Sequence, residues 1–437
     1  MNKWQELYAK KLLTAGQLSR KFNSNDRCVS NGQVVEPVEI LKSLAERANM
    51  GQVEGIEYHI LAPQKHQPYL DPGMSKKIHL NALFVSRPTI DLVWDGYADY
   101  LPSFYGEIPK NVPERGDIDV FVTSVSTMDR HGYFSFGAAA DLSALHREAK
   151  RVFLEVNSTM PRVHGNCFIH ISEVDFLCES KTPISEKYYG ELTEIDCRIG
   201  EIVAREIPDG ACLQLGFGQM PNAIVRALMD KKDLGIHSEM FTDGMMDLIE
   251  AGVVNNSRKS IHVGKSIASF TNGSRNLYDF LDDNPGIEFH PINYTNDPMI
   301  IGRNDNVRSI NSCIEVDLFS QVCSESIGPK TFSGVGGQVD FVRGAKLSKG
   351  GKSIIAMKST AKNGEISKIK AVLTKGAVVT TSRNDVDNII TEYGIASLRG
   401  KTCSERAKEL ISIAHPKFRE QLEKEARGIN IISKNGR

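Results

Sequence analysis

Glu239 is the residue whose surroundings most directly suggest covalent chemistry. It lies in Gly-Ile-His-Ser-Glu-Met-Phe-Thr-Asp-Gly, residues 235–244, in or just after a short predicted strand and between two glycines. Thr242 or Asp243 is placed to cap a helix that begins at residue 245. A carboxylate in a site that limits water can attack an acyl group as a nucleophile. From this pattern alone, the alternative is an ordinary exposed glutamate at a strand end.

A glycine turn precedes this block. Residues 213–221 read Leu-Gln-Leu-Gly-Phe-Gly-Gln-Met-Pro, so a predicted strand ends in Gly-Phe-Gly and runs into a helix opened by proline. Glycines let a ligand approach the backbone closely, and a helix N-terminus attracts phosphate. Pro221 stands where the dinucleotide-binding pattern has its third glycine. The turn therefore indicates either a phosphate-containing ligand or only a tight strand-to-helix connection.

A second glycine-rich segment, residues 332–341, reads Phe-Ser-Gly-Val-Gly-Gly-Gln-Val-Asp-Phe. Backbone N–H groups in such a loop can hold an oxyanion that develops during a reaction. A flexible loop is the alternative, although the segment lacks the serine-rich, polar composition of linkers.

Short apolar strands alternate with helical patterns along the chain. This alternation predicts an α/β fold with mostly parallel sheets. A length of 437 residues suggests two or three domains of roughly 150 residues each. The polar segment 183–196 favours a boundary near residue 190, and hence domains over residues 1–190 and 191–437. The strand candidates are residues 118–122, 151–156, 211–215 and 352–356.

An internal repeat supports two similar α/β halves. Residues 34–37 lead into a helix over 38–44, and residues 218–221 lead in the same way into a helix over 222–228. Proline is well tolerated in the first turn of each helix. A second echo relates residues 117–121 to residues 313–319. This register places His59 at the position of Glu239, so only the second half would hold the carboxylate, and ligands often bind where α/β units meet.

Composition excludes several classes of function. The formal net charge is −1, and the absence of a basic cluster argues against a nucleic-acid partner. No apolar run approaches the ~18 residues of a membrane span, and the N-terminus lacks a signal-peptide core, so a cytoplasmic protein without membrane contact is expected. Eight cysteines without a CxxC pair predict reduced thiols. No zinc-type motif occurs, so no metal is expected.

Together with these motifs, further blocks resemble the acetyl-CoA hydrolase/transferase family of class I CoA-transferases over nearly the whole chain. The most specific blocks are the glycine turn and the segment around Glu239. The blocks include a predicted strand over residues 377–381. The others are residues 129–135, 155–157, 170–172, 247–252, 332–341 and 391–396.

The resemblance implies a class I CoA-transferase fold with the active site between two similar domains. It assigns Glu239 as the nucleophile of a ping-pong reaction that passes through a glutamyl-CoA thioester. Asn311 and Gly337 would lie near the oxyanion. The CoA contacts would be Gly216, Phe217, Gly218, Gln219, Met220, Ile314, Gly337 and Lys362.

The implied substrates are a short-chain acyl-CoA and a carboxylate of the acetate, butyrate or 4-hydroxybutyrate type. No permanently bound cofactor is expected. The expected assembly is a homodimer or a higher homo-oligomer. An acyl-CoA hydrolase that uses the same glutamate, and a CoA-binding protein without catalysis, are the alternatives. Departures from the family pattern at Gln219, Asn222 and Lys358 bear on acyl specificity and CoA affinity.

Overall fold

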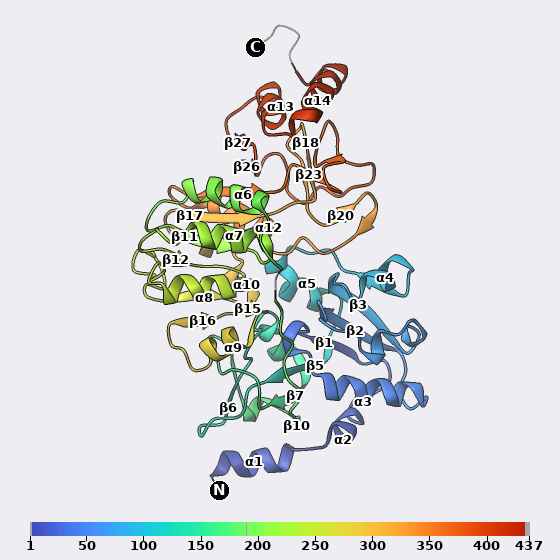
Figure 1. The fold of residues 1–437 in the computed structure, drawn as a ribbon. Coiled ribbons are helices and arrows are strands. Elements are labelled where there is room, and N and C mark those ends of the chain that lie inside the picture. The colour runs from blue at the N-terminus through green and yellow to red at the C-terminus, as the bar shows by residue number, and fades with distance from the viewer. Residues whose placement is uncertain (1, 189, 433–437) are drawn as a thin grey trace. The chain divides into compact units, whose positions relative to one another are not determined.

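The described residues, 2–188 and 190–432 of this computed structural model, divide into two units. Unit 1 comprises Met1–Tyr188 together with Ile267–Thr295, and unit 2 comprises Tyr189–Ser266 together with Asn296–Arg437. Each unit is therefore assembled from two separate stretches of the chain. Figure 1 labels many of their helices and strands.

Unit 1 is built on a seven-stranded sheet in which all neighbouring strands run parallel. The predicted strands over 118–122 and 151–156 are confirmed as β5 and β7. In spatial order the strands are β10 (Phe176–Ser180), β7 (Ala149–Asn157), β5 (Ile118–Val125), β1 (Arg27–Ser30), β2 (Ile56–Leu61), β3 (Ile78–Phe84) and β4 (Ala98–Tyr100). The order reverses between β5 and β1.

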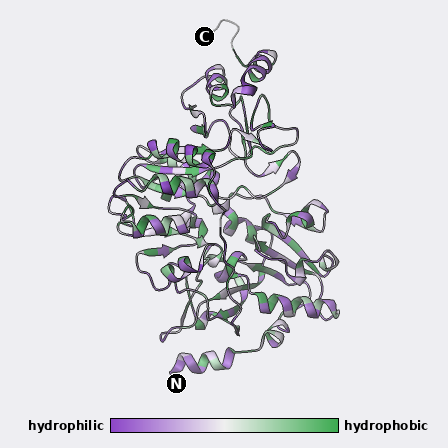
Figure 2. Cartoon of the chain, in the orientation of Figure 1, coloured by the Kyte–Doolittle hydropathy of each residue, from purple (hydrophilic) through white to green (hydrophobic). Residues whose placement is uncertain are grey.

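Helix α3 shows how unit 1 fills its core. Its apolar residues recur at helical spacing, and Ile40, Leu41 and Leu44 are buried among the side chains of the sheet. Helix α1 has no buried residue, and Figure 2 shows it as mostly hydrophilic. The helices of unit 1 are α1 (Lys3–Lys11), α2 (Ala15–Ser19), α3 (Val38–Asn49), α4 (Ile90–Trp94), α5 (Ile108–Glu114), α9 (Arg275–Leu281) and α10 (Ile292–Thr295).

Unit 2 contains a six-stranded sheet, parallel except for its last pair. The predicted strands over 211–215 and 352–356 are confirmed as β11 and β22. The order is β12 (Gly235–Ile236), β11 (Cys212–Leu215), β17 (Val307–Asn311), β22 (Lys352–Ala356), β26 (Asn388–Thr391) and β27 (Gly394–Ser397). The fold class, two α/β units with mostly parallel sheets, is thus confirmed.

Close helix contacts in unit 2 depend on glycine. A Cβ atom on Gly200 of α6 would lie 2.7 Å from the carbonyl oxygen of Ala223 in α7, and Figure 1 shows these helices side by side. The helices of unit 2 are α6 (Glu194–Arg205), α7 (Gln219–Ala227), α8 (Asp243–Glu250), α11 (Pro298–Ile301), α12 (Gln338–Leu347), α13 (Cys403–Ser412) and α14 (Pro416–Gly428).

The first part of the internal repeat is confirmed. The sequence β1–α3–β2 in unit 1 matches β11–α7–β12 in unit 2, with a parallel pair joined by a helix in both. Pro37 and Pro221 each lie nine residues after a cysteine of the first strand, Cys28 and Cys212 respectively. These cysteines therefore occupy equivalent positions.

The strand pairing corrects the register proposed for His59. Cys28 pairs with Tyr58, and its counterpart Cys212 pairs with Gly235. Four residues further on are Ala62 (58 + 4) in unit 1 and Glu239 (235 + 4) in unit 2. Ala62, not His59, is therefore the counterpart of Glu239; His59 lies within β2, fully buried, where its Nε2 accepts a hydrogen bond from Arg27.

Two further expectations from the sequence are wrong. The first is the match of residues 117–121 with residues 313–319. Strand β5 pairs with β1 in unit 1, and β17 pairs with β11 in unit 2, so β17 is the counterpart of β5. Residues 315–317 instead form β18 (Glu315–Asp317) of a small separate sheet. Residues 377–381 do not form a strand beyond one bridge, Thr381 with Val322. Val378 and Val379 are 45% and 43% exposed, so their β-branched side chains do not mark a buried strand.

All eight cysteines are free thiols, six of them buried, as predicted. Over the described ranges, none of the helices combines the length and apolar character needed to cross a lipid bilayer.

Candidate active site

The position of Glu239 follows from the end of strand β12. His237 N–H donates to the Leu213 carbonyl at 3.0 Å, and Ser238 Oγ donates to the Leu215 carbonyl, so the chain stays beside β11 beyond the formal end of the strand. Glu239 then emerges at the carboxyl edge of the parallel sheet, where ligands of open α/β sheets bind. Thr242 is the N-cap of α8, although its side chain forms no capping hydrogen bond.

Asn296 is the side chain that holds Glu239. Its Nδ2 donates to Glu239 Oε2 at 2.7 Å and to Asp340 Oδ2 at 3.2 Å, and the residue is fully buried. Both neighbours are carboxyl groups, so the amide presents its NH₂ group to them rather than its oxygen. Asp297 caps the short helix α11, with Pro298 in its first turn, and this helix start fixes the chain next to Asn296.

Gly337 closes the other side of the carboxyl group. It is the N-cap residue of α12, and its backbone N–H forms a hydrogen bond with Glu239. A Cβ atom at Gly337 would overlap both Glu239 Oε2 and Asn296 Nδ2. Only glycine at position 337 leaves room for the Glu239 carboxyl group and the Asn296 amide beside its own backbone.

Helices α11 and α12 approach closely enough to bring Asn296 and Gly337 together. A Cβ atom on Gly344 of α12 would lie 2.5 Å from a side-chain carbon of Ile301 in α11. The glycine allows the helix axes to come closer than two larger side chains would permit. Since Asn296 directly precedes the Asp297 cap of α11 and Gly337 is the N-cap of α12, this contact helps to bring both residues to Glu239.

The environment of Glu239 raises its pKa to about 8. Desolvation by burial is the largest cause, and the nearby negative charge of Asp340 adds to it. Hydrogen bonds from Asn296 and Gly337 act in the opposite direction, because they stabilise the carboxylate. Glu239 is therefore a carboxyl group that ionises at mildly alkaline pH while two N–H donors already face it.

Asn311, the other polar residue predicted near the oxyanion, lies at the end of β17 in an amide network. Its Nδ2 donates to Ser309 Oγ at 3.0 Å and to Gln214 Oε1 at 3.2 Å. None of its hydrogen bonds to the described residues reaches Glu239. Its role near the oxyanion stays a prediction.

Gln214 and Asn296 were not singled out from the sequence. Gln214 Oε1 accepts hydrogen bonds from Ser309 Oγ at 2.8 Å and from the N–H of Ile310 at 3.1 Å, so it fixes the end of β17 beside β11. The strand order of unit 2 reverses between these two strands, which is the usual ligand-binding position of such sheets. For Asn296, the sequence signals only a helix start at Pro298, two residues later, and that signal does not indicate a contact with Glu239.

The predicted CoA-binding turn is a true strand-to-helix turn. Gly216, Phe217 and Gly218 connect β11 to α7, and Gly218 is the N-cap with φ of 117°, a conformation that favours glycine. Phe217 is 54% exposed. Helix α7 begins at Gln219, with Met220 second, so it starts two residues before the predicted proline. The turn offers an aromatic face and a helix N-terminus in one place.

The two remaining predicted CoA contacts lie away from this turn in sequence. Ile314 follows β17, and its N–H donates to the Cys323 carbonyl at 2.9 Å. Lys362 is exposed, with φ of 48°, in the turn between β23 (Thr360–Ala361) and β24 (Ile366–Ser367). Its ammonium group is accessible to an anionic ligand.

Two departures from the family pattern have structural partners. Gln219 Nε2 donates to the Glu191 carbonyl at 2.9 Å, and Lys358 Nζ pairs with Asp196 Oδ2 at 3.0 Å. Gln219 opens α7 and Lys358 follows β22, so both join segments that follow sheet strands to the region around α6. Asn222 lies in the first turns of α7, where its N–H donates to the Gly218 carbonyl.

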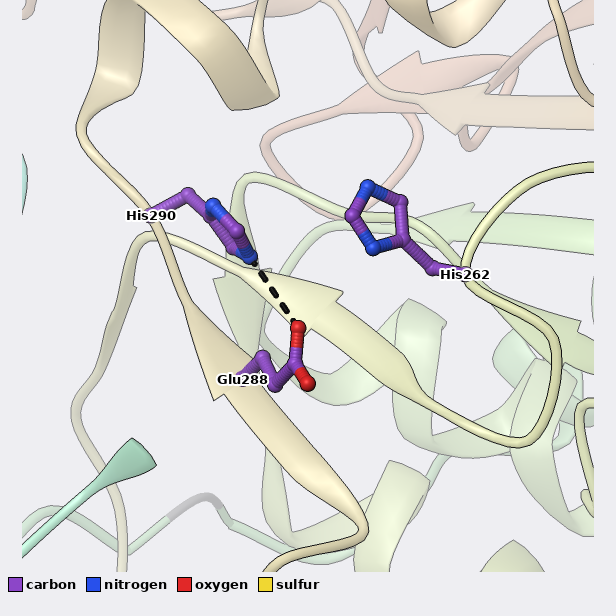
Figure 3. A group of neighbouring side chains, drawn as sticks. All are labelled: His262, Glu288 and His290. Atoms are coloured by element: carbon purple, nitrogen blue, oxygen red, sulfur yellow. Dashed lines mark hydrogen bonds and ion pairs between the residues drawn. The ribbon is translucent and has the colours of Figure 1, made fainter. Parts of the chain in front are cut away.

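Unit 1 contains two neighbouring side chains, a histidine and a glutamate, of the types that bind metal ions. His290 Nε2 is 3.3 Å from Glu288 Oε2 in and just after β16 (Ile287–Phe289), as Figure 3 shows. The third side chain drawn there, His262, belongs to unit 2. A catalytic zinc site uses three protein ligands, so the two donors of this pair carry no metal assignment.

The geometry around Glu239 suits acyl chemistry. A half-buried carboxyl group, with its pKa raised to about 8, faces a backbone N–H and a side-chain amide. The same donors can stabilise negative charge on an oxygen of its carboxyl carbon when that carbon is attacked.

Comparisons with known proteins agree with this chemistry. Residues 1–185 match the acetyl-CoA hydrolase/transferase N-terminal domain, and residues 273–426 match the corresponding C-terminal domain. The 4-hydroxybutyrate coenzyme A transferase of Clostridium kluyveri is 48% identical over 96% of this chain and 98% of its own. The succinyl-CoA:cyclohexane-1-carboxylate CoA transferase of Geobacter metallireducens is 44% identical over 98% of both chains.

Solved structures give the same result. The crystal structure of 4-hydroxybutyrate CoA-transferase from Porphyromonas gingivalis has a TM-score of 0.83 and 38% identity, and the match covers 98% of this chain and all of that one. Sequence and structure agree across the full length of both proteins. The chain therefore belongs to the acetyl-CoA hydrolase/transferase family of enzymes.

Proposed function

We propose that this enzyme transfers coenzyme A between a short-chain acyl-CoA and a carboxylate, with Glu239 as the covalent nucleophile. The observation that carries the proposal is the contact of the Glu239 carboxyl group with Asn296 Nδ2 and the Gly337 N–H. The relatives named above support CoA transfer as the reaction class. The acids that best match them are of the acetate, butyrate or 4-hydroxybutyrate type.

The first half of the reaction places CoA on the enzyme. The Glu239 carboxylate attacks the thioester carbonyl, the C–S bond breaks, and an acyl-glutamyl anhydride and CoA thiolate result. The thiolate then attacks the glutamyl carbonyl of the anhydride. This step releases the first acid as a carboxylate and leaves a glutamyl-CoA thioester.

The second half reverses these steps with another acid. The incoming carboxylate attacks the glutamyl thioester and expels CoA thiolate, which then attacks the new acyl carbonyl. The new acyl-CoA leaves, and Glu239 is restored as a carboxylate. Asn296 and Gly337 donate hydrogen bonds to the oxygen that becomes negative whenever the glutamyl carbon is attacked.

The proposal predicts a covalent CoA adduct on Glu239. Acyl-CoA supplied without an acceptor acid should leave CoA bound to the enzyme as a thioester, because the second half-reaction lacks its substrate. Mass spectrometry of the intact protein and of the peptide that contains Glu239 measures the adduct. Borohydride treatment should reduce it, and Glu239→Gln should carry none.

An acyl-CoA hydrolase that uses the same glutamate is the competing function. It would release free CoA without any acceptor acid, at a rate equal to that of exchange between acyl-CoA and acetate. A stable adduct with negligible CoA release supports the transferase, since the site then keeps water from the thioester. CoA release as fast as exchange contradicts it.

The raised pKa of Glu239 predicts an alkaline shift in activity. The carboxylate is the nucleophile, so kcat/KM for acyl-CoA should increase with pH and level off above a midpoint near 8. Asp340→Asn removes the negative charge that helps raise this pKa, and the midpoint should move to lower pH. Initial rates measured between pH 6 and 9.5, roughly the window around that pKa, test both statements.

Glu420→Gln provides the control for this profile. Glu420 is an exposed residue of α14, so the substitution removes one negative charge without altering the surroundings of Glu239. Its pH profile should match the wild type. An unchanged midpoint in Asp340→Asn would show that Asp340 does not influence the ionisation of Glu239.

A further inference from the structure

The two hydrogen-bond donors that face Glu239 differ in how they are held. The Gly337 N–H belongs to the backbone at the start of α12, so its direction is fixed by the main chain. The Asn296 amide ends a side chain whose terminal torsion has a broad, roughly two-fold preference, so its NH₂ group and its oxygen can exchange places. The orientation that directs Nδ2 at Glu239 therefore has to be maintained by neighbouring groups.

The groups that maintain it are two carboxyl groups on the Nδ2 side. Nδ2 donates to Glu239 Oε2 at 2.7 Å and to Asp340 Oδ2 at 3.2 Å, which accounts for both of its hydrogens. The amide oxygen, Asn296 Oδ1, is buried and has no hydrogen-bond partner among the described residues. The orientation of the amide therefore depends on Glu239 and Asp340. All three residues belong to unit 2.

Asp340 is a buried acid in the first turn of α12, with 5% of the residue exposed. At this position of a helix, a side chain often accepts a hydrogen bond from the N–H of the N-cap residue. Here the N-cap is Gly337, whose N–H contacts Glu239 instead, and the Asp340 carboxyl group accepts from Asn296. The N-terminus of the helix favours a negative charge at Asp340. A carboxylate is therefore available to hold the amide.

The covalent intermediate changes the balance between the two acceptors. When Glu239 carries CoA, its carboxyl carbon keeps one carbonyl oxygen and bears sulfur in place of the other, and its negative charge is gone. A hydrogen bond to a neutral carbonyl oxygen is roughly half as strong as one to a carboxylate. Asp340 is then the stronger acceptor facing Nδ2. It holds the amide at the stage when the glutamyl carbonyl is attacked and its oxygen needs a donor.

We infer that Asp340 is a positioning residue, which keeps the Asn296 N–H directed at the glutamyl oxygen while CoA is covalently bound. The inference rests on the proposed function, because it concerns the glutamyl-CoA thioester of that reaction. The negative charge of Asp340 also has an opposing effect, since it raises the pKa of Glu239 and disfavours the free nucleophile. The hydrogen bond to Asn296 gives this buried acid a role that offsets that cost.

The test measures how fast acetate discharges the glutamyl-CoA thioester. The enzyme is loaded with acetyl-CoA, small molecules are removed, and loss of the CoA adduct after addition of acetate is followed by rapid quenching and mass spectrometry. Asp340→Leu should slow discharge about tenfold or more, because a misdirected amide is a lost oxyanion donor. Asp340→Asn also lacks the charge but keeps an acceptor oxygen, so it should retain most of the wild-type rate.

The pH dependence of discharge separates this role from the effect of Asp340 on ionisation. Glu239 has no titrating carboxyl group in the thioester, and acetate is ionised throughout roughly pH 6 to 9.5. The defect of Asp340→Leu should therefore be the same across this window. Glu405→Leu is the matched control, because Glu405 is the acid at the same position of α13 and is exposed. It should discharge at the wild-type rate.

A double variant tests whether Asp340 acts through Asn296. Asn296→Ala lacks the side-chain donor, so adding Asp340→Leu to it should slow discharge no further. A further loss in the double variant would overturn the inference, and so would equal slowing in Asp340→Asn and Asp340→Leu. Wild-type discharge in Asp340→Leu would overturn it as well, and would leave the transferase intact.

Failure of the proposed function gives a different result. A wild-type enzyme that forms no CoA adduct contradicts the transferase mechanism, and the inference falls with it. If Asp340→Leu fails to fold, a crystal structure of the wild-type glutamyl-CoA enzyme decides. Asn296 Nδ2 should then lie about 2.9 Å from Asp340 Oδ2, and a separation beyond about 3.5 Å would overturn the inference.

Discussion

Glu239→Gln is expected to lower the rate of CoA exchange by at least about a thousandfold, because an amide cannot form the acyl anhydride. The substitution preserves the shape of the side chain, and the amide oxygen can still accept hydrogen bonds from Asn296 and Gly337. Exchange between acetyl-CoA and a labelled carboxylate measures the loss. Activity within tenfold of the wild type would contradict the role of Glu239.

The same variant should be more stable than the wild type at alkaline pH. Burial raises the pKa of Glu239 to about 8, so the folded state holds a proton that the unfolded chain loses near its ordinary pKa of about 4.3. The stabilisation from this proton is complete below that pH and is lost as the pH rises through about 8. Glutamine avoids this loss.

Thermal unfolding at two pH values measures this effect. The midpoint of Glu239→Gln should exceed that of the wild type by several degrees at pH 9, and the two should nearly coincide at pH 5, at about 2–4 °C per kcal/mol for units of this size. A higher midpoint together with lost exchange separates a catalytic role from a structural one. Equal midpoints at pH 9 would mean that the ionised carboxylate is not costly in the folded enzyme.

Gly337→Ala should lower exchange by about a hundredfold or more while the protein still folds. The added Cβ overlaps Glu239 Oε2 and Asn296 Nδ2, so one of the two must move. The backbone itself accepts alanine, since Gly337 has φ of −86° and ψ of 5°. Replacing a glycine N-cap by alanine costs only about 1 kcal/mol or less, so stability should change far less than activity.

Gly73→Ala is the matched control for Gly337→Ala. A Cβ on Gly73 meets no atom within 4 Å, and it tests the effect of adding a methyl group in a turn of unit 1. Exchange should remain at the wild-type rate. If Gly337→Ala also kept the wild-type rate, the contact between Glu239 and the start of α12 would not be needed for transfer.

Much of the fold was readable from the sequence because its strongest signals are local. Parallel strands buried on both faces appear as short apolar runs, and the repeated strand–turn–helix–strand pattern survives in both units. The strand expected over residues 377–381 was wrong for a related reason. Val378 and Val379 have β-branched side chains, but burial decides whether such residues form a strand, and these two are exposed.

The site was only partly readable from the sequence. Glu239 and Gly337 were both identified, and the structure places them in contact. Asn296 was not identified, because its contact with Glu239 depends on the approach of α11 to α12 through Gly344, which no local pattern reports. Asn311 donates a hydrogen bond to Gln214, and its role near the oxyanion stays a prediction.

The alignment of the two repeated segments, residue by residue, also could not be predicted from the sequence. Similarity between two short segments does not determine which residues pair across strands, and a shift of three positions separates His59 from Ala62. Hydrogen-bonded pairing to β1 and β11 supplied the missing reference. The left-handed conformation of Ala62, with φ of 40°, has no signature in residue type, since alanine is found in every kind of element.

The division of each unit between two stretches of chain affects how the protein is made. Unit 1 requires residues 267–295, which supply β16 beside β8 (His164–Gly165), the bond from Tyr278 Oη to the Ser185 carbonyl and the one from Asn272 to Gln64. On a ribosome, the N-terminal sheet can form early, but its last partners emerge only after more than seventy residues of unit 2, the stretch 189–266. Unit 1 can therefore complete its fold only after the first stretch of unit 2 has been made, and unit 2 still awaits residues 296–437 at that point.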